Sequence, residues 1–249
     1  MHLRRQKRPT PENLLNPVGL QDLILFQDDW VLVIDKPAGI PVHQGPGGGP
    51  HLGEYVRAPD VGPKTAPELA HRLDRLTSGC LVLGRHHRAL RRLGTLFANG
   101  QVDKCYWALV SGIPATPSGH LDAPLRPCPE KSRKTPSQNG RMEVHPDGHS
   151  AHTDFRVLGT FGALSWLELR PRSGRTHQIR VHCAHMGCPV VGDPLYGLRL
   201  AAGSGSPFLQ LHARSITMPL YTNQKPINVV APPPRHMLPL LIACGYPSE

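Results

Sequence analysis

The sequence predicts an α+β fold with a mixed, mostly antiparallel central sheet flanked by helices and loops. Three observations predict this class. Segments with the apolar pattern of strands outnumber segments with helical spacing, short polar turns separate many consecutive strands, and no internal repeat is present. Short turns between consecutive strands favour antiparallel pairing over a doubly wound parallel sheet.

The first predicted elements are a hairpin and a buried strand. "LILFQDDWVLVIDKPAG", which begins at Leu23, has two apolar runs parted by a polar turn and ends at Pro37 and Gly39. Residues 43–70 are too rich in glycine and proline to continue a sheet, so we expect a long surface loop. "CLVLGR", from Cys80, then reads as a short buried strand.

A helix is predicted next, in "HHRALRRLGTLFANG". Ala89, Leu90, Leu93, Leu96 and Phe97 recur at helical spacing, and Asn99 and Gly100 give a C-terminal stop. The opposite face carries arginines. Two interpretations of that face stay open, a row of phosphate contacts and an ordinary solvated face; its arginines are Arg85, Arg88, Arg91 and Arg92.

The second half of the chain is also predicted to be rich in strands. "VDKCYWALVSG" is a strand, residues 114–150 are a Pro-rich variable segment of irregular structure, and residues 151–174 form a second hairpin. "RTHQIRVHCAHMG" predicts a short helix that ends at Gly187, and "FLQLHARSITMPL" predicts a late strand. The Pro-rich end from Ala231 is expected to be peripheral. We expect one domain over residues 21–249.

Charge and composition indicate the class of partner. The chain has 28 Lys and Arg against 18 Asp and Glu, a formal charge of +10 that favours a polyanion, with nucleic acid the first candidate. Residues 1–20 form a basic N-terminal arm, read as a disordered tail or, second, as an RNA contact. Six cysteines without a CxxC pair favour a reducing compartment. Together with the lack of a long apolar stretch, they predict a cytoplasmic protein that does not bind membranes.

Two kinds of site are disfavoured by the spacing of their residues. His177, His182, His185, Cys183 and Cys188 are crowded into one segment and lack the paired spacing of zinc sites, so no metal is predicted. The glycines of "GPGGGPHL" lack the Lys-Ser/Thr ending of a phosphate loop. No nucleotide cofactor is expected either.

Asp74 is the first candidate for chemistry. In "HRLDRLTSG" it stands between Arg72 and Arg75, and a nearby cation favours the ionised carboxylate that a nucleophile or base requires. Taken alone, this motif supports a structural ion pair more readily than a catalytic residue. A second cluster, "RPRSGRTHQIRVH", needs an anion to offset its arginines. Phosphates, a carboxylate such as Asp74, and bulk counterions all stay open.

Five blocks, in order, resemble the RluA-type pseudouridine synthases. They are "VIDKPAGIPVH", "HRLDRLTSG", "VDKCYWALVSG", "SGRTHQIRVHCAHMGCPVVGDPLYG" and "LQLHARSITM", and together they span roughly residues 23–220. The resemblance implies the pseudouridine synthase catalytic fold and an isomerase that converts a specific uridine in structured RNA to pseudouridine. It implies no metal, nucleotide or redox cofactor.

The resemblance also implies roles for single residues. Asp74 matches the catalytic aspartate, Arg180 the arginine that pairs with it, and Tyr106 the tyrosine that stacks on the target base. Arg72 matches the residue that occupies the place of the flipped-out nucleotide. Leu211 is expected to help wall the uracil pocket. Further RNA-binding candidates are Arg75, Lys36, Lys104, Arg175 and His177, with a structural role as the alternative for the two lysines.

One departure from the family bears on substrate choice. Many relatives carry an N-terminal S4 RNA-binding domain, and the residues before Leu23 are expected to leave no room for one. RNA selection is then assigned to the catalytic domain, the basic arm or the insertions. The RNA is tRNA or rRNA, and the protein is expected to be a monomer. An RNA-binding or RNA-folding protein with dispensable catalysis is the alternative function.

Overall fold

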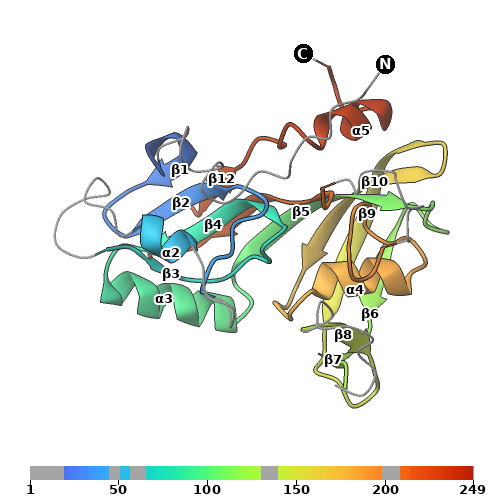
Figure 1. The fold of residues 1–249 in the computed structure, drawn as a ribbon. Coiled ribbons are helices and arrows are strands. Elements are labelled where there is room, and N and C mark those ends of the chain that lie inside the picture. The colour runs from blue at the N-terminus through green and yellow to red at the C-terminus, as the bar shows by residue number, and fades with distance from the viewer. Residues whose placement is uncertain (1–19, 45–50, 57–65, 130–139, 198–207, 249) are drawn as a thin grey trace. The chain divides into compact units, whose positions relative to one another are not determined.

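The computed structural model describes residues 20–44, 51–56, 66–129, 140–197 and 208–248. The chain divides into two compact units. Unit 1 comprises residues 1–102, 200–206 and 215–231, and unit 2 comprises residues 103–199, 207–214 and 232–249. Each unit combines antiparallel strand pairs with helices, which confirms the predicted α+β class (Figure 1). The predicted basic arm lies almost wholly outside the described residues.

Unit 1 contains the predicted hairpin. β1 (Ile24–Gln27) pairs antiparallel with β2 (Val31–Lys36), and β2 pairs with β4 (Ser78–Gly84). Every residue of β4 is buried, as its continuous apolar run predicts. A short strand, β3 (Glu68–Leu69), pairs with the other edge of β4. The turn between β1 and β2 is held by Asp28, whose carboxylate accepts hydrogen bonds from the backbone N–H groups of Trp30 and Val31.

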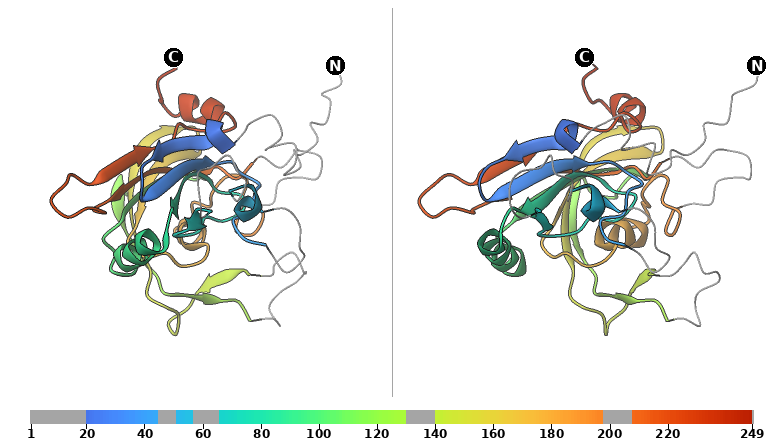
Figure 2. Two further views of the ribbon diagram at one scale, coloured as in Figure 1. Left: turned by 90° about the vertical axis from the view of Figure 1, so that its left-hand side faces the viewer. Right: turned by 60° about the vertical axis from the view of Figure 1, so that its left-hand side comes forward.

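The remaining elements of unit 1 come from distant parts of the chain. β11 (Leu211–Met218) contributes residues 211–214 to unit 2 and residues 215–218 to unit 1. In unit 1 it pairs with β12 (Ile227–Val230), and Figure 2 shows this hairpin beside β1. Two short helical segments, η1 (Leu20–Leu23) and α2 (Leu52–Tyr55), complete the unit. The loop predicted over residues 43–70 therefore holds one helical turn and a short strand where it is described.

The predicted helix of unit 1 is α3 (His87–Ala98), which packs against β4. Its buried residues are Ala89, Leu93 and Leu96, three members of the predicted apolar face. His86 caps the N-terminus, because its Nδ1 accepts the backbone N–H of Ala89. The helix ends at Ala98, Asn99 is its C-cap, and Gly100 follows with a φ of 65°, which suits a residue without a Cβ. The apolar face joins the core formed by β2, β4, β11 and β12.

Unit 2 is built on four antiparallel strands. β5 (Asp103–Ser111) pairs with β10 (Leu164–Pro171), β10 with β9 (His152–Phe161), and β9 with β6 (Ser118–Asp122). The β9–β10 hairpin confirms the prediction for residues 151–174. The helix predicted before Gly187 is α4 (Gln178–His185).

The prediction of irregular structure for residues 114–150 is wrong for part of the segment. It contains β6 and a two-stranded sheet of β7 (Leu125–Pro127) and β8 (Met142–Val144). β6 carries little apolar signal because every second residue is exposed and Leu121 is its one large apolar residue. His120 and Asp122 pair with Asp154 and His152. Residues 130–139 lie outside the described part of the chain.

The C-terminal segment is not peripheral, which corrects a second prediction. It contains α5 (Leu238–Ala243), and Met237, Leu241 and Cys244 are buried in one cluster with Trp107 and Trp166. The two indole rings stand edge to face, with centroids 4.8 Å apart. A Cβ on Gly159 would lie 1.7 Å from the carbonyl oxygen of Cys244, so only glycine permits this approach. The proline-rich sequence hid a short helix that starts with proline in its first turn.

Two further findings concern the chain as a whole. All six cysteines are buried free thiols. Within the described residues, no helix is long and apolar enough to cross a membrane.

Candidate active site

Asp74 lies in unit 1, in the loop between β3 and β4. The loop is closed by a hydrogen bond of 3.1 Å from the backbone N–H of Thr77 to the carbonyl oxygen of Asp74. Leu73 and Thr77 are buried, Asp74 is half-buried, and the neighbouring Arg72 and Arg75 are exposed. The loop is therefore anchored by the buried Leu73 and Thr77, and its two arginines lie in solvent.

Lys36 supports this loop from inside unit 1. Its side chain is fully buried, and Nζ donates to the carbonyl oxygens of Pro37, Ile40 and Arg75 at 2.8, 3.0 and 3.2 Å. The Arg75 carbonyl also accepts the backbone N–H of Gly39. Burial lowers the pKa of Lys36 to about 7, although Asp74 and Asp35 oppose this shift. Of the two roles left open for Lys36, the structural one fits this burial.

His71 gives the Asp74 loop a second support. Its Nε2 accepts the backbone N–H of Val82 at 3.0 Å, and its ring stacks on Phe97 of α3 with centroids 4.8 Å apart. The Nε2 atom must be unprotonated to accept this hydrogen bond. The sequence analysis did not single out His71, because its partners lie on a strand and a helix that follow it in the chain.

Arg180 lies in α4 of unit 2 and forms a buried ion pair. Its Nε and Nη2 donate to the two carboxylate oxygens of Asp193 at 2.7 and 2.9 Å. The side chain of Arg180 is 4% exposed and that of Asp193 is fully buried. Asp193 also accepts the backbone N–H groups of Leu195 and Tyr196. The pair is thus fixed by four hydrogen bonds to one carboxylate.

Tyr196 completes the surroundings of Arg180. The guanidinium carbon lies 5.2 Å from the centre of the Tyr196 ring. The phenol oxygen accepts the backbone N–H of Met142 and contacts Nδ1 of His177 at 2.9 Å. Burial raises the pKa of Tyr196 to about 12, so the phenol is neutral at physiological pH. His177 has a φ of 55°, which a non-glycine residue adopts only where its surroundings hold it.

A buried polar network fixes the rest of α4. Gln178 accepts hydrogen bonds from Ser173 Oγ and the Arg175 backbone N–H, and donates to Thr153 Oγ1. His182 contacts Thr153 Oγ1 through Nδ1 and the Ala123 carbonyl through Nε2. A carbonyl only accepts, so His182 carries its proton on Nε2, and the Thr153 hydroxyl donates to Nδ1. Burial lowers the pKa of His182, which favours this neutral form.

The other predicted residues of unit 2 lie on β5, on β11 and before α4. Lys104 and Tyr106 share one face of β5 and are half-buried, whereas Cys105 and Trp107 point into the core. Lys104 Nζ donates to the carbonyl oxygen of Ser173 at 3.0 Å, and burial lowers its pKa. Arg175 is exposed and Leu211 is buried.

The structure groups the predicted residues by unit. Asp74, Arg72, Arg75 and Lys36 form one cluster in unit 1, and Arg180 and His177 join around Tyr196 in unit 2. Asp74 and Arg180 belong to different units, so their pairing stays a prediction. Asp193 was missed, although its motif "GDPLYG" was noted, because the sequence offered several anions for the arginine cluster and no way to rank them.

Comparisons with known proteins agree with these motifs. A family model described as RNA pseudouridylate synthase matches residues 30–185. The chain is 38% identical over 213 residues to an uncharacterized RNA pseudouridine synthase of Zymomonas mobilis, covering 85% of this chain and 94% of that protein. It is 36% identical over 236 residues to the ribosomal large subunit pseudouridine synthase D of Xanthomonas campestris, covering 88% and 68%.

A solved structure is similar as well. The human RNA pseudouridylate synthase domain containing 4 matches with a TM-score of 0.72 and 28% identity, over 90% of this chain and 94% of that one. The family match spans the loop of Asp74, β5 and α4, which carry the catalytic candidates. The chain therefore belongs to the RNA pseudouridylate synthase family, in its RluA-type branch, and is an isomerase that acts on RNA.

Proposed function

We propose that this enzyme isomerises one specific uridine in a structured RNA and that Asp74 is its catalytic carboxylate. The observation that carries the proposal is the support of the Asp74 loop. The buried Lys36 donates a hydrogen bond to the Arg75 carbonyl. His71 is held by a hydrogen bond from Val82 and by stacking on Phe97, and the backbone N–H of Thr77 closes a turn on the Asp74 carbonyl. A half-buried carboxylate on a braced loop is suited to chemistry, because reacting groups must be held in position before the substrate binds.

The reaction conserves atoms. The bond between N1 of uracil and C1′ of ribose breaks, the base turns, and a bond forms between C5 and C1′. The proton on C5 is lost and N1 gains one, so no oxidant or reductant is consumed. Asp74 acts as a nucleophile towards ribose or uracil, or as the base that removes a ribose proton. Each route requires the ionised carboxylate.

The other residues are assigned to binding and electrostatics. Arg180 is the counter-ion of Asp74, and its bond to Asp193 keeps the guanidinium in one orientation. Tyr106 stacks on the target base, and Leu211 walls the uracil pocket. Arg72 fills the place that the flipped nucleotide leaves, which its exposure permits. Arg75, Lys104, Arg175 and His177 contact RNA close to the reacting nucleotide, while Lys36 braces the Asp74 loop from inside.

Ribosomal RNA is the first substrate to test. The relative from Xanthomonas is named as a large-subunit enzyme, and the alignment covers 68% of that protein. Transfer RNA is the second candidate. We propose that the protein acts in the cytoplasm as a monomer.

The test is a comparison of wild type with Asp74→Asn. RNA from cells that lack the protein is labelled with tritium at uridine C5, and release of tritium reports pseudouridine formation. We expect Asp74→Asn to release none while binding the RNA with the affinity of wild type. Asp147→Asn, at a carboxylate that is 83% exposed, is the matched control and should be fully active. Activity in Asp74→Asn would refute the role, and full support of the cell by that variant would favour RNA binding as the function.

A further inference from the structure

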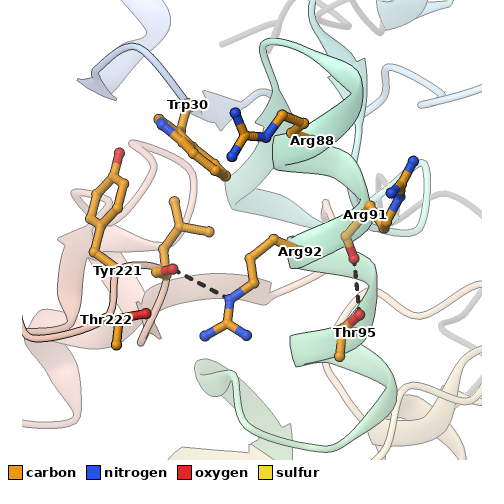
Figure 3. A pocket seen from close by; sticks show the side chains of 8 residues that line it. Trp30, Arg88, Arg91, Arg92, Thr95, Tyr221 and Thr222 are labelled. Carbon is orange, nitrogen blue, oxygen red and sulfur yellow. Dashed lines mark hydrogen bonds between the residues drawn. The ribbon is translucent and has the colours of Figure 1, made fainter.

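A second candidate site lies in unit 1, in a cavity of about 500 Å³. Its lining contains none of the residues that we assign to the reaction. α3 forms one wall, and the chain segment that follows β11 forms the opposite wall (Figure 3). Trp30 closes one end. The lining residues are Trp30, Arg88, Arg91, Arg92, Thr95, Leu220, Tyr221 and Thr222.

The cavity has an excess of positive charge. Arg88, Arg91 and Arg92 are all exposed, and α3 contains no acidic residue. Among the residues that the structure describes, no carboxylate lies within ion-pair distance of these three guanidinium groups. The adjacent Asp28 carboxylate already accepts hydrogen bonds from two backbone N–H groups of its own turn and from the hydroxyl of Tyr221. Three neighbouring cations favour an anionic ligand.

An aromatic wall adjoins these charges. Trp30 and Tyr221 stand edge to face with ring centroids 5.9 Å apart, and the guanidinium of Arg88 lies 5.7 Å from the centre of the indole. His86 holds the indole from another side at 4.9 Å. Trp30 is therefore fixed before a ligand arrives, which reduces the entropy that binding costs.

Contacts within the protein hold part of this arginine face in place. Arg92 Nε donates to the carbonyl oxygen of Leu220 at 3.4 Å, which ties α3 to the opposite wall (Figure 3). The hydroxyl of Thr95 donates to the Arg91 carbonyl at 3.0 Å and so stays close to the helix. Within the described part of the molecule, the side-chain nitrogens of Arg91 make no hydrogen bond or ion pair, so this guanidinium is available to a ligand.

We propose that this cavity binds a single-stranded segment of the RNA substrate outside the reacting nucleotide, with a base against Trp30 and adjacent phosphates on Arg88, Arg91 and Arg92. Aromatic side chains beside a cationic groove are the general means of binding single-stranded nucleic acid. The proposal rests on RNA being the substrate, and it assigns to the arginine face of α3 the phosphate contacts that the sequence left open.

The test uses a fluorescein-labelled twelve-residue oligouridylate, whose binding is followed by anisotropy between 50 and 300 mM salt, about the range over which phosphate contacts respond. Removing one phosphate contact from a single strand should lower the slope of log affinity against log salt by about 0.7. We expect Arg91→Ala and Arg88→Ala each to show this smaller slope, with binding about fivefold weaker at 50 mM salt.

Matched variants separate this site from general electrostatics. Arg235→Ala removes the same charge from an exposed position in unit 2 and should keep the wild-type affinity and slope. Trp30→Leu should weaken binding about tenfold through lost stacking, and Trp30→Phe should restore most of it. Arg91→Ala and Arg88→Ala variants that behave as Arg235→Ala does would overturn the proposal, as would failure of the wild type to bind the oligonucleotide.

The outcome is independent of catalysis. All variants are measured a second time in the Asp74→Asn background, where no pseudouridine is expected. If the protein with Asp74 intact formed no pseudouridine but still lost oligonucleotide binding through Arg91→Ala, the proposed reaction would be refuted and this site would stand. If the protein were a fully active synthase and Arg91→Ala bound the oligonucleotide with wild-type affinity, the site proposed here would be refuted and the proposed reaction would stand.

Discussion

Arg180 and Asp193 form a two-point ion pair that is almost completely buried within unit 2. The pair spans 13 residues of sequence and joins α4 to the turn that follows it. Because the carboxylate also accepts two backbone N–H groups, it fixes the turn and the guanidinium together. Asp193 is thus a positioning residue for Arg180, which we assign to the active site.

Asp193→Asn is expected to lower both stability and turnover. An amide cannot accept at both positions that face Arg180, so the variant buries an uncompensated charge and should lose about 3 kcal/mol of unfolding free energy. Urea unfolding measures this loss. The kcat should fall while the Kd for RNA stays near the wild-type value, because the change alters the orientation of Arg180. Asp147→Asn is the control, and equal kcat in both variants would contradict the positioning role.

Lys36→Met is expected to impair the Asp74 loop. The variant fills most of the lysine volume but removes the Nζ donor from the carbonyls of Pro37, Ile40 and Arg75, although the Arg75 carbonyl keeps the backbone N–H of Gly39. We expect a cost of about 2 to 4 kcal/mol. We expect lower kcat, together with a lower midpoint in urea. Lys225→Met, at an exposed position, provides the comparison. A Lys36→Met protein with unchanged kcat would show that this support is dispensable for the reaction.

The pKa of His182 predicts how stability depends on pH. Burial lowers this pKa below its usual 6.5, so the unfolded chain binds more protons than the folded chain at pH values between the two. The contribution of neutral His182 to the free energy of unfolding is fully present above about pH 6.5. It falls on acidification by at most about 1.4 kcal/mol per pH unit. His182→Gln should be less stable at pH 7 and lose less between pH 7 and 5. Parallel curves for the two proteins would disprove the assignment. His236 has a lowered pKa too, but it is common to both proteins.

Phe97→Leu tests the stack that holds His71. Leucine keeps the apolar character of the helix but loses the flat face that contacts the imidazole ring. We expect kcat to fall several-fold, the Kd for RNA to stay constant and α3 to remain helical by circular dichroism. Phe161→Leu, at a side chain that is 60% exposed, should match the wild type. If both variants have the same kcat, the stack does not position the loop.

The sequence predicted those elements whose residues carry their own signal. β2 and β4 have continuous apolar runs and α3 has an apolar face with helical spacing, and their burial follows these patterns. β6 and α5 were missed for the same reason, because both depend on partners that are distant in the sequence. β6 pairs with β9, about 30 residues later in the chain, and α5 is followed by a close approach of Cys244 to Gly159, about 80 residues earlier. Neither interaction is visible in a local window of sequence.

The candidate site shows the same division. Asp74, Arg180 and Tyr106 stood out because they lie in recognisable blocks of sequence. The residues that hold them did not, since the contacts of His71 with Phe97 and of Arg180 with Asp193 depend on tertiary structure. A sequence can thus suggest which groups react more readily than which groups position them.

The three tryptophans are distributed unequally, and this makes the two units optically distinct. Trp30 alone reports on unit 1. Trp107 and Trp166, with centroids 4.8 Å apart and α5 packed on them, are close enough for their electronic transitions to couple and give a near-ultraviolet signal specific to unit 2. One unlabelled sample therefore carries two spectroscopic probes, and their melting curves would reveal whether the halves of this enzyme unfold together or in sequence.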